Sequence, residues 1–167
     1  MLYRSDKPDS RRQFEAASEA LPKGWRLDAI AVDKSDSVAA AIDKLMQRRV
    51  DIVWTSADTA IYDTPAVRSL LLSAMRSKTP VFGFSPAFAR AGAVIGIGID
   101  PASQGAQAAA LTIKVLQQAT SARSSPGTIE PPSQFQIILN AVAAQQLGIE
   151  LPDSVIQKAS QVFKDNR

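Results

Sequence analysis

The regular alternation of strand-like and helical patterns constrains the fold of this chain more than any other feature of its sequence. The strand patterns are short runs rich in apolar and β-branched residues: Leu2–Arg4, Arg26–Val32, Val50–Thr55, Val81–Phe84, Val94–Ile99 and Phe135–Leu139. The helical patterns fill the intervals and the C-terminal end: Ser10–Leu21, Ser37–Arg49, Pro65–Ser77, Pro86–Ala91, Ala102–Ala119, Ala141–Leu147 and Asp153–Lys164. Short strands that alternate with helices are typical of βαβ units. We therefore predict an α/β fold with a doubly wound, mostly parallel sheet and helices on both faces.

Capping residues support the predicted starts of several helices. Asp63-Thr64-Pro65, Ser85-Pro86 and Asp100-Pro101 each place a short polar side chain before a proline, whose fixed φ angle suits the first helical position. Asn140 is predicted to cap the helix that follows the last strand. These signals do not depend on apolar periodicity, so they support the α/β interpretation independently.

The length and composition of the chain fit one globular domain. It has 167 residues, of which 46% are apolar and 21% are charged, and domains of about 100–150 residues are the most common. No convincing internal repeat is found, and the one long loop pattern, Thr120–Pro132, is rich in serine and proline. We therefore predict a single α/β domain over residues 1–167.

The chain contains no cysteine and no histidine. This composition excludes disulfide bonds, cysteine nucleophiles, thiolate zinc sites and catalytic triads that use imidazole as the base. Only Asp, Lys, Ser or Tyr could carry out chemistry, and no nucleophile and base occur at a recognisable spacing. We predict a non-catalytic protein without a metal or cofactor. The net charge of +3 is too small to require a nucleic-acid partner.

Small polar side chains follow most of the predicted strands. They are Ser5, Asp6, Asp33, Thr55, Ser56, Asp58, Thr59, Ser85 and Asp100. The carboxyl ends of parallel strands meet at one edge of a sheet, and ligands of open sheets bind at that edge. These polar side chains therefore predict a site for a small polar or zwitterionic molecule. Carboxylates would bind an ammonium group, and hydroxyls and free N–H groups would bind a carboxylate or phosphate. Ser85 and Asp100 are alternatively explained as helix caps.

Two further features of these strands have more than one interpretation. Gly96 and Gly98 fall within a strand instead of at a strand-to-helix turn, so they do not form a dinucleotide fingerprint. Glycines in this position are expected to allow a close approach of backbone or helix. Trp54 either faces a ligand or belongs to the core.

A two-component receiver domain is an alternative with the same size and alternation. Asp6, Asp58 and Ser85 imitate three of the positions that its chemistry needs. The fifth strand, however, is followed by Asp100 and Pro101 in place of the lysine that would hold a phosphoryl oxygen. A carboxylate at this position would repel the phosphoryl group, which argues against receiver activity.

Several stretches resemble one group of ABC-transporter substrate-binding proteins. The pattern "iPVf…GA…GiDyyelG" of that group is resembled by Pro80–Phe84, Gly92-Ala93, Gly98-Ile99-Asp100 and Gln104-Gly105. Asp51–Thr59 (DIVWTSADT) is similar to the segment "Daiyvp.Dnt", and Ile138–Phe163 is similar to the closing signature "iNlkaAkaLGitiPdsllarAdevi". The resemblance covers nearly the whole chain, and the closing signature is its most specific part.

This resemblance implies a type I periplasmic-binding-protein fold, in which two Rossmann-like lobes close on a small solute. The chain corresponds to the second lobe, including the C-terminal helices over residues 141–164. The implied function is a non-catalytic module that contributes a cleft for an amino-acid-like solute of an ABC transporter. The predicted ligand contacts are Ser56, Asp58, Thr59, Ser85 and Asp100. The sequence departs from the family after Asp100, where Pro101 and Ala102 replace an aromatic pair.

The resemblance also implies partners and a location. The partners are the small solute, an ABC permease, and a first lobe that this sequence lacks or another chain in its place. The implied location is periplasmic or the cell surface; a complete chain would be cytoplasmic, because Met1 opens directly into a strand pattern without a signal peptide. An alternative function is a sensory or partner-binding domain that has lost transport.

The predicted helix Ala102–Ala119 is apolar on more than one side. Such a helix requires burial on more than one side, so it either folds back on its own sheet or is covered by another subunit. We predict a homodimer with this helix at or near the interface.

Overall fold

The computed structural model describes residues 1–34, 36–118 and 129–164. Its strands are β1 (Leu2–Tyr3), β2 (Ile30–Ala31), β3 (Val53–Trp54), β4 (Val81–Gly83), β5 (Ile95–Ile99), β6 (Phe135–Asn140) and β7 (Gln161–Phe163). Its helices are α1 (Pro8–Glu19), α2 (Val38–Gln47), α3 (Thr64–Arg76), α4 (Pro86–Ala91), α5 (Pro101–Gln118), α6 (Ala141–Leu147) and α7 (Asp153–Ile156). Strands and helices alternate from β1 to α6, as the sequence predicts.

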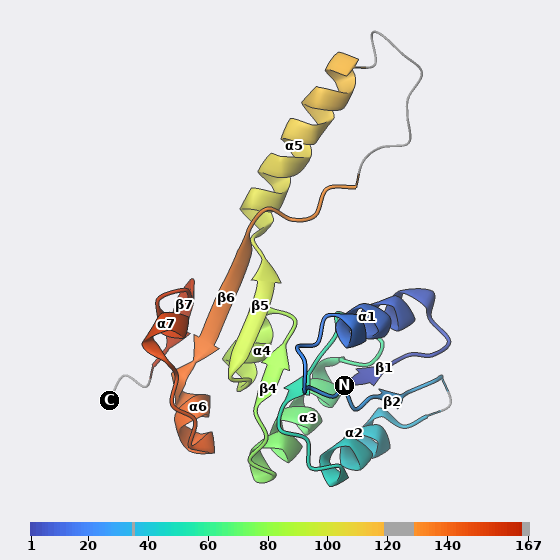
Figure 1. Cartoon of the computed structure of the whole chain (residues 1–167), viewed down its shortest axis with the longest axis vertical. Coiled ribbons are helices and arrows are strands. Elements are labelled where there is room, and N and C mark those ends of the chain that lie inside the picture. Colours follow the sequence, from blue (N-terminus) through green and yellow to red (C-terminus); the bar gives the residue numbers. More distant parts are fainter. Residues whose placement is uncertain (35, 119–128, 165–167) are drawn as a thin grey trace.

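The strands form two hydrogen-bonded groups (Figure 1). A five-stranded sheet has the order β3-β4-β5-β6-β7, and β1 pairs with β2. All hydrogen-bonded neighbours are parallel except β5 and β6, which are antiparallel. The predicted α/β fold with a mostly parallel sheet is therefore confirmed. The antiparallel pairing of β5 with β6 was not predicted from the sequence.

Two strands are shorter than predicted. Of Arg26–Val32 only Ile30–Ala31 is a strand, and of Val50–Thr55 only Val53–Trp54. Each is limited by its partner, because β2 pairs with two residues of β1 and β3 pairs with two residues of β4. A run of β-branched residues becomes a strand only over the length that a neighbour can hydrogen-bond.

The C-terminal segment contradicts the prediction of a helix over residues 153–164. α7 ends at Ile156, and Gln161–Phe163 form β7 parallel to β6. The backbone N–H of Ser160 donates to the carbonyl oxygen of Ile137 at 2.8 Å, and the N–H of Ile137 donates to Ser160 Oγ at 3.3 Å. Pairing with the edge of β6 therefore outweighs the local helical pattern, in a segment whose β-branched and aromatic side chains also favour a strand.

The main core lies between the strands β1 to β4 and the helices α2 and α3. Its fully buried members include Leu2 of β1, Val53 of β3, and one leucine from each of the two helices, Leu45 and Leu70. A second, smaller cluster joins residues next to β5 with α6. The buried leucines of α2 and α3 thus belong to the same core as the strands.

Two glycines of β5 allow α4 to lie close to the sheet. A Cβ atom added to Gly96 would lie 2.4 Å from the carbonyl oxygen of Ser85, and one added to Gly98 would lie 2.6 Å from Pro86 Cδ. The expected close approach is therefore confirmed. It holds the start of α4 beside the carboxyl half of β5, where a ligand site was predicted.

Most of the predicted caps are present. The side-chain oxygens of Asp63, Asp100 and Asn140 each accept a hydrogen bond from the backbone N–H three residues later, at 2.8, 2.8 and 2.9 Å. The Ser85 side chain makes no such bond, contrary to the prediction. The reason is that the N–H it would cap, that of Phe88, already donates to the Ser85 carbonyl oxygen at 3.1 Å.

Helix α5 extends away from the sheet (Figure 1). One of its sides contacts the segment that leads back to β6: Gln107 donates to the carbonyl oxygen of Pro131 at 2.9 Å and accepts from the N–H of Ser133 at 3.0 Å. Large apolar side chains remain more than half exposed, at 56%, 52% and 65% for Ile113, Val115 and Leu116. Of the two arrangements considered for this helix, folding back on its own sheet is therefore not the one adopted.

Candidate functional site

The predicted site residues follow three neighbouring strands of the five-stranded sheet. Ser56, Asp58 and Thr59 come after β3, Ser85 comes after β4, and Asp100 comes after β5. Because β3, β4 and β5 are adjacent and parallel, their carboxyl ends lie at the same edge of the sheet. The structure therefore brings these strand ends to one edge, although it holds the individual side chains in different ways.

Ser56 and Asp58 differ sharply in burial and bonding. Ser56 is 1% exposed, and its hydroxyl oxygen has no hydrogen-bond partner within the described residues. Asp58 is half-buried and its carboxylate accepts a hydrogen bond from the N–H of Ala60 at 3.0 Å. Thr59 is exposed. A buried polar atom without a partner is costly, so the Ser56 hydroxyl is the group in this turn that gains most from a ligand.

Asp100 is held by the protein itself. One carboxylate oxygen accepts from the N–H of Ser103 at 2.8 Å and the other accepts from Gln136 Nε2 at 2.8 Å. These bonds fix the junction of β5, α5 and β6, which agrees with the alternative that Asp100 is a cap. Ser85, by contrast, is half-buried at the start of α4 and its side chain makes no capping bond.

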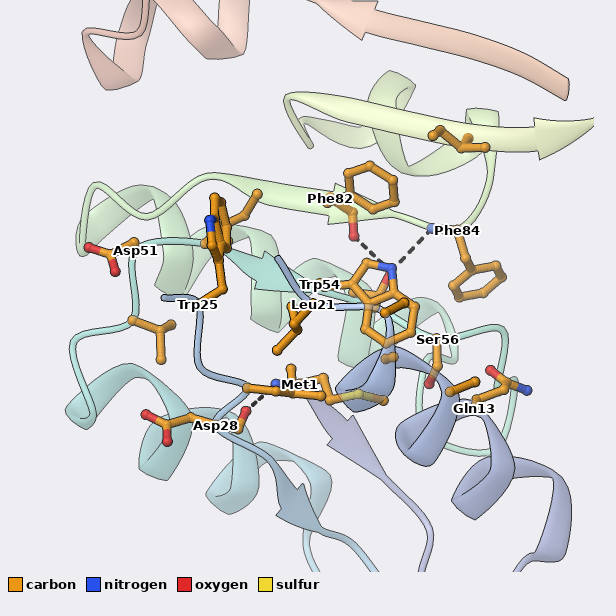
Figure 2. Close-up of a pocket in the computed structure, with 18 of the residues that line it drawn as sticks. Met1, Gln13, Leu21, Trp25, Asp28, Asp51, Trp54, Ser56, Phe82 and Phe84 are labelled. Atoms are coloured by element: carbon orange, nitrogen blue, oxygen red, sulfur yellow. Dashed lines mark hydrogen bonds between the residues drawn. The ribbon is translucent and has the colours of Figure 1, made fainter. Parts of the chain in front are cut away.

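Thr55 has a structural role between β3 and β4. It is fully buried; its hydroxyl donates to the carbonyl oxygen of Phe82 at 3.1 Å and accepts from the N–H of Phe84 at 3.2 Å. Both bonds are drawn in Figure 2. The hydroxyl thus joins the two strand ends and positions the turn that carries Ser56.

A charged cluster lies at the carboxyl ends of β1 and β2. Arg4 donates from Nε and Nη2 to the Asp6 carboxylate at 3.0 and 2.8 Å, and the Ser5 hydroxyl donates to the Asp33 carboxylate at 2.7 Å. The hydrogen bond with Asp6 raises the pKa of the Arg4 guanidinium, to which Asp58 and Asp33 add smaller Coulombic effects. The same bond lowers the pKa of Asp6.

Arg4 is the residue of this cluster that the sequence analysis missed. Its side chain is 11% exposed, and the charge of Asp58 acts on it. The sequence signal for Arg4 is its position at the end of the first strand pattern, directly before Ser5 and Asp6, which were among the polar residues noted at the strand ends. Arg4 adds a positive charge to a set of predicted site residues that contained only hydroxyls and carboxylates.

A groove of about 1340 Å³ runs along the face of the sheet from this edge (Figure 2). Its aromatic lining consists of Trp25, Trp54, Phe82, Phe84 and Phe135. Ser56 and Phe84 lie at one end, Asp28 and Asp51 lie at the other, and Trp54 lies between them. Trp54 is half-buried and lines the groove, and it is not a member of either core cluster, so the core interpretation is not the one observed.

Among the described residues, no three Asp or Glu side chains come together in a group that could hold a metal ion. None of the described helices is both long and apolar enough to cross a membrane.

Comparison with solved structures shows the same fold in proteins about twice as long. A conserved domain protein from Vibrio cholerae is similar with a TM-score of 0.73 and 23% identity, over 97% of this chain and 53% of that one. An ABC domain from Streptococcus pneumoniae in complex with L-Trp is similar with a TM-score of 0.71 and 25% identity, over 97% and 55%. A ligand-free, open substrate-binding protein with adhesive properties from Clostridium difficile is similar with a TM-score of 0.70 and 21% identity, over 98% and 53%.

These matches cover nearly all of this chain but only about half of each similar structure. No protein of curated function matches the sequence. The family described as "ABC transporter substrate binding protein" matches residues 1–163. Its match extends from β1 to β7 and thus includes every strand end of the candidate site. The chain therefore belongs to the ABC transporter substrate-binding protein family.

Proposed function

We propose that this chain is a non-catalytic module that contributes one side of a cleft for a small, amino-acid-like solute of an ABC transporter. The observation that carries the proposal is the buried hydroxyl of Ser56, which has no hydrogen-bond partner among the described residues and comes two positions before Asp58 at the edge of the sheet. Membership of a substrate-binding family supports solute binding. The L-Trp complex of the similar protein from Streptococcus pneumoniae supports an amino-acid-like ligand.

The proposed contacts are four of the predicted residues, Ser56, Asp58, Thr59 and Ser85, and the fifth, Asp100, is proposed to support them. In this arrangement Asp58 binds the ammonium group of the solute, and the hydroxyls of Ser56, Thr59 and Ser85 bind its carboxylate. Asp100 acts by keeping the junction of β5 and α5 in place, because both of its oxygens are already bonded. Arg4 joins the proposed set as a second partner for a carboxylate.

Thermal unfolding of the chain with each of the common amino acids tests this proposal. A ligand at about 100 times its Kd should add roughly 2.7 kcal/mol to the free energy of unfolding. Asp58→Asn should abolish the increase, whereas Asp43→Asn, an exposed carboxylate on α2, should leave it unchanged. No increase with any amino acid at millimolar concentration would contradict a working solute site in this chain.

The partners and the location belong to the same proposal. Residues 1–167 act as one lobe-like domain outside the cytoplasm, next to an ABC permease, and a first lobe or another chain forms the other side of the cleft.

The exposed apolar side chains of α5 support a homodimer with this helix at its interface. Light scattering at tens of micromolar tests it: a mass near the monomer value of 17.9 kDa would contradict the dimer.

A further inference from the structure

The groove beside the candidate site has a chemical character of its own. It is larger than the roughly 300–1,000 Å³ of most small-molecule sites, at about 1340 Å³. Both tryptophans of the chain line it, together with Phe82 of β4 and Phe84 just beyond that strand. A single amino acid would fill only part of this space, and the aromatic lining favours an apolar occupant.

The aromatic side chains of the groove are supported differently. Phe84 packs on the buried ring of Phe88, with ring centroids 4.9 Å apart, and on that of Tyr62, at 6.0 Å. The floor at this end is therefore rigid. Trp25 lies at the opposite end on the segment after α1 and is 63% exposed. A fixed floor and an exposed aromatic lip favour a flat molecule that stacks along the sheet face.

The two ends of the groove carry polar groups that apolar contacts do not satisfy. Ser56 is 1% exposed, and its hydroxyl has no partner in the described part of the chain. At the far end the residues that line the groove include three arginines and two aspartates: Arg26, Arg48, Arg49, Asp28 and Asp51.

The charges at that far end leave an excess of guanidinium. Arg26 pairs with Asp28 at 3.2 Å. Arg48 donates to the carbonyl oxygen of Ala29 at 3.2 Å, and within the described residues neither Arg48 nor Arg49 forms an ion pair with a carboxylate. Asp51 is the remaining carboxylate, so one positive charge is left over at this end.

We propose that this groove binds a flat, polycyclic aromatic anion. Its rings lie between Trp25 and Trp54, and its anionic group faces Arg48 and Arg49. This site goes beyond the proposed solute cleft, because its ligand class and most of its residues are different and it does not require an amino acid.

Fluorescence titration of the full chain tests the proposal with 8-anilinonaphthalene-1-sulfonate as the probe. Because both tryptophans line the groove, a probe bound there should quench the tryptophan emission of the chain by energy transfer, with saturation at one probe per chain. Trp25→Ala should weaken probe binding roughly two- to tenfold through the loss of one aromatic contact. Leu116→Ala on α5, also an exposed apolar side chain, should not change the Kd.

The anionic part of the proposal has its own control. N-phenyl-1-naphthylamine has the same rings without the sulfonate, so it should bind the native chain more weakly. Arg49→Gln should weaken binding of the sulfonate roughly two- to fivefold and leave the neutral probe unaffected. Arg49 is exposed, so its substitution should leave the fold intact, and circular dichroism of each variant checks this directly.

Two results would overturn the proposal. Weaker probe binding by the Leu116→Ala variant, with no change in the Trp25→Ala variant, would show that the probe binds to α5 and not in the groove. Displacement of the probe by millimolar L-Trp would make the groove a part of the solute site instead of a site of its own. If the chain binds the probe but shows no thermal shift with any amino acid, the groove proposal holds and the solute-cleft proposal is contradicted. The two proposals can therefore fail separately.

Discussion

Helices α3 and α5, of 13 and 18 residues, have similar shares of apolar residues, yet their surroundings are opposite. α3 packs Leu70 and Ala74 into the main core, where they are 0% and 1% exposed. α5 carries Ile113, Val115 and Leu116, all more than half exposed. The comparison shows that the apolar content of a helix predicts that it requires burial, but does not predict which surface will cover it.

The difference between the two helices has a local cause. α3 starts at the Asp63 cap and returns directly to β4, so its apolar side must lie against neighbouring strands. α5 starts where Asp100 is bonded to both Ser103 and Gln136, and it continues beyond the end of β5. The bonded junction directs α5 away from the sheet. Within the described residues, polar contacts such as that of Lys114 with Glu130 at 3.8 Å join it to the returning segment.

The largest expected effect comes from the buried member of a matched pair of leucines. Leu70→Ala should lower the free energy of unfolding by about 3–5 kcal/mol, because it removes apolar contacts and leaves a cavity in a fully buried site. Urea unfolding followed by circular dichroism measures the change. A loss below about 1 kcal/mol would show that the α3 side of the molecule is no better packed than α5.

An intermediate effect is expected where α4 meets the sheet. Gly96→Ala should cost about 1–3 kcal/mol, because the added Cβ atom would lie 2.4 Å from a backbone oxygen that cannot rotate away. Gly105→Ala in α5 is the matched control, since a Cβ atom there meets nothing within 4 Å. It should stabilise the chain slightly, by roughly 0.5–1 kcal/mol, through higher helix propensity. Equal effects of the two substitutions in urea unfolding would contradict the close contact at β5.

The smallest expected effect is that of Leu116→Ala. In an isolated chain this substitution should change the free energy of unfolding by less than about 0.5 kcal/mol, because the side chain is 65% exposed. In a dimer that covers α5 the loss should be larger and should grow with protein concentration. Thermal unfolding over a hundredfold range of concentration separates the two cases and also tests the proposed interface.

The fold was predictable where local pattern and tertiary pairing agree. The strands β1, β4, β5 and β6 and helices α2 to α6 lie where periodicity and caps place them within a residue or two. The exceptions are the shortened strands β2 and β3 and the stretch after α7. In that stretch Gln161–Phe163 pair with β6 in place of continuing a helix. The local sequence does not predict this pairing, because the pairing depends on the free edge of a strand more than twenty residues away in sequence.

The candidate site was predictable in position but not in bonding. Ser56, Asp58 and Ser85 were identified because residues that follow parallel strands meet at one edge. The sequence could not separate Ser56, whose hydroxyl has no partner among the described residues, from Asp100, whose two oxygens are bonded. It also gave no indication of the groove, since Trp25 and Phe82 come together only through the packing of the segment after α1 against the sheet face.

By itself, the sequence determined the α/β class, most element positions, the absence of cysteine and histidine chemistry, and the family. These properties follow from periodicity, caps, composition and motifs, each of which is local in the chain. Only the tertiary structure decided which strand pairs are antiparallel, that α5 leaves the sheet, which polar groups remain unsatisfied, and that a groove lies beside them. The physical reason is that burial and hydrogen-bond satisfaction are properties of neighbours in space, and residues far apart in sequence supply most of those neighbours.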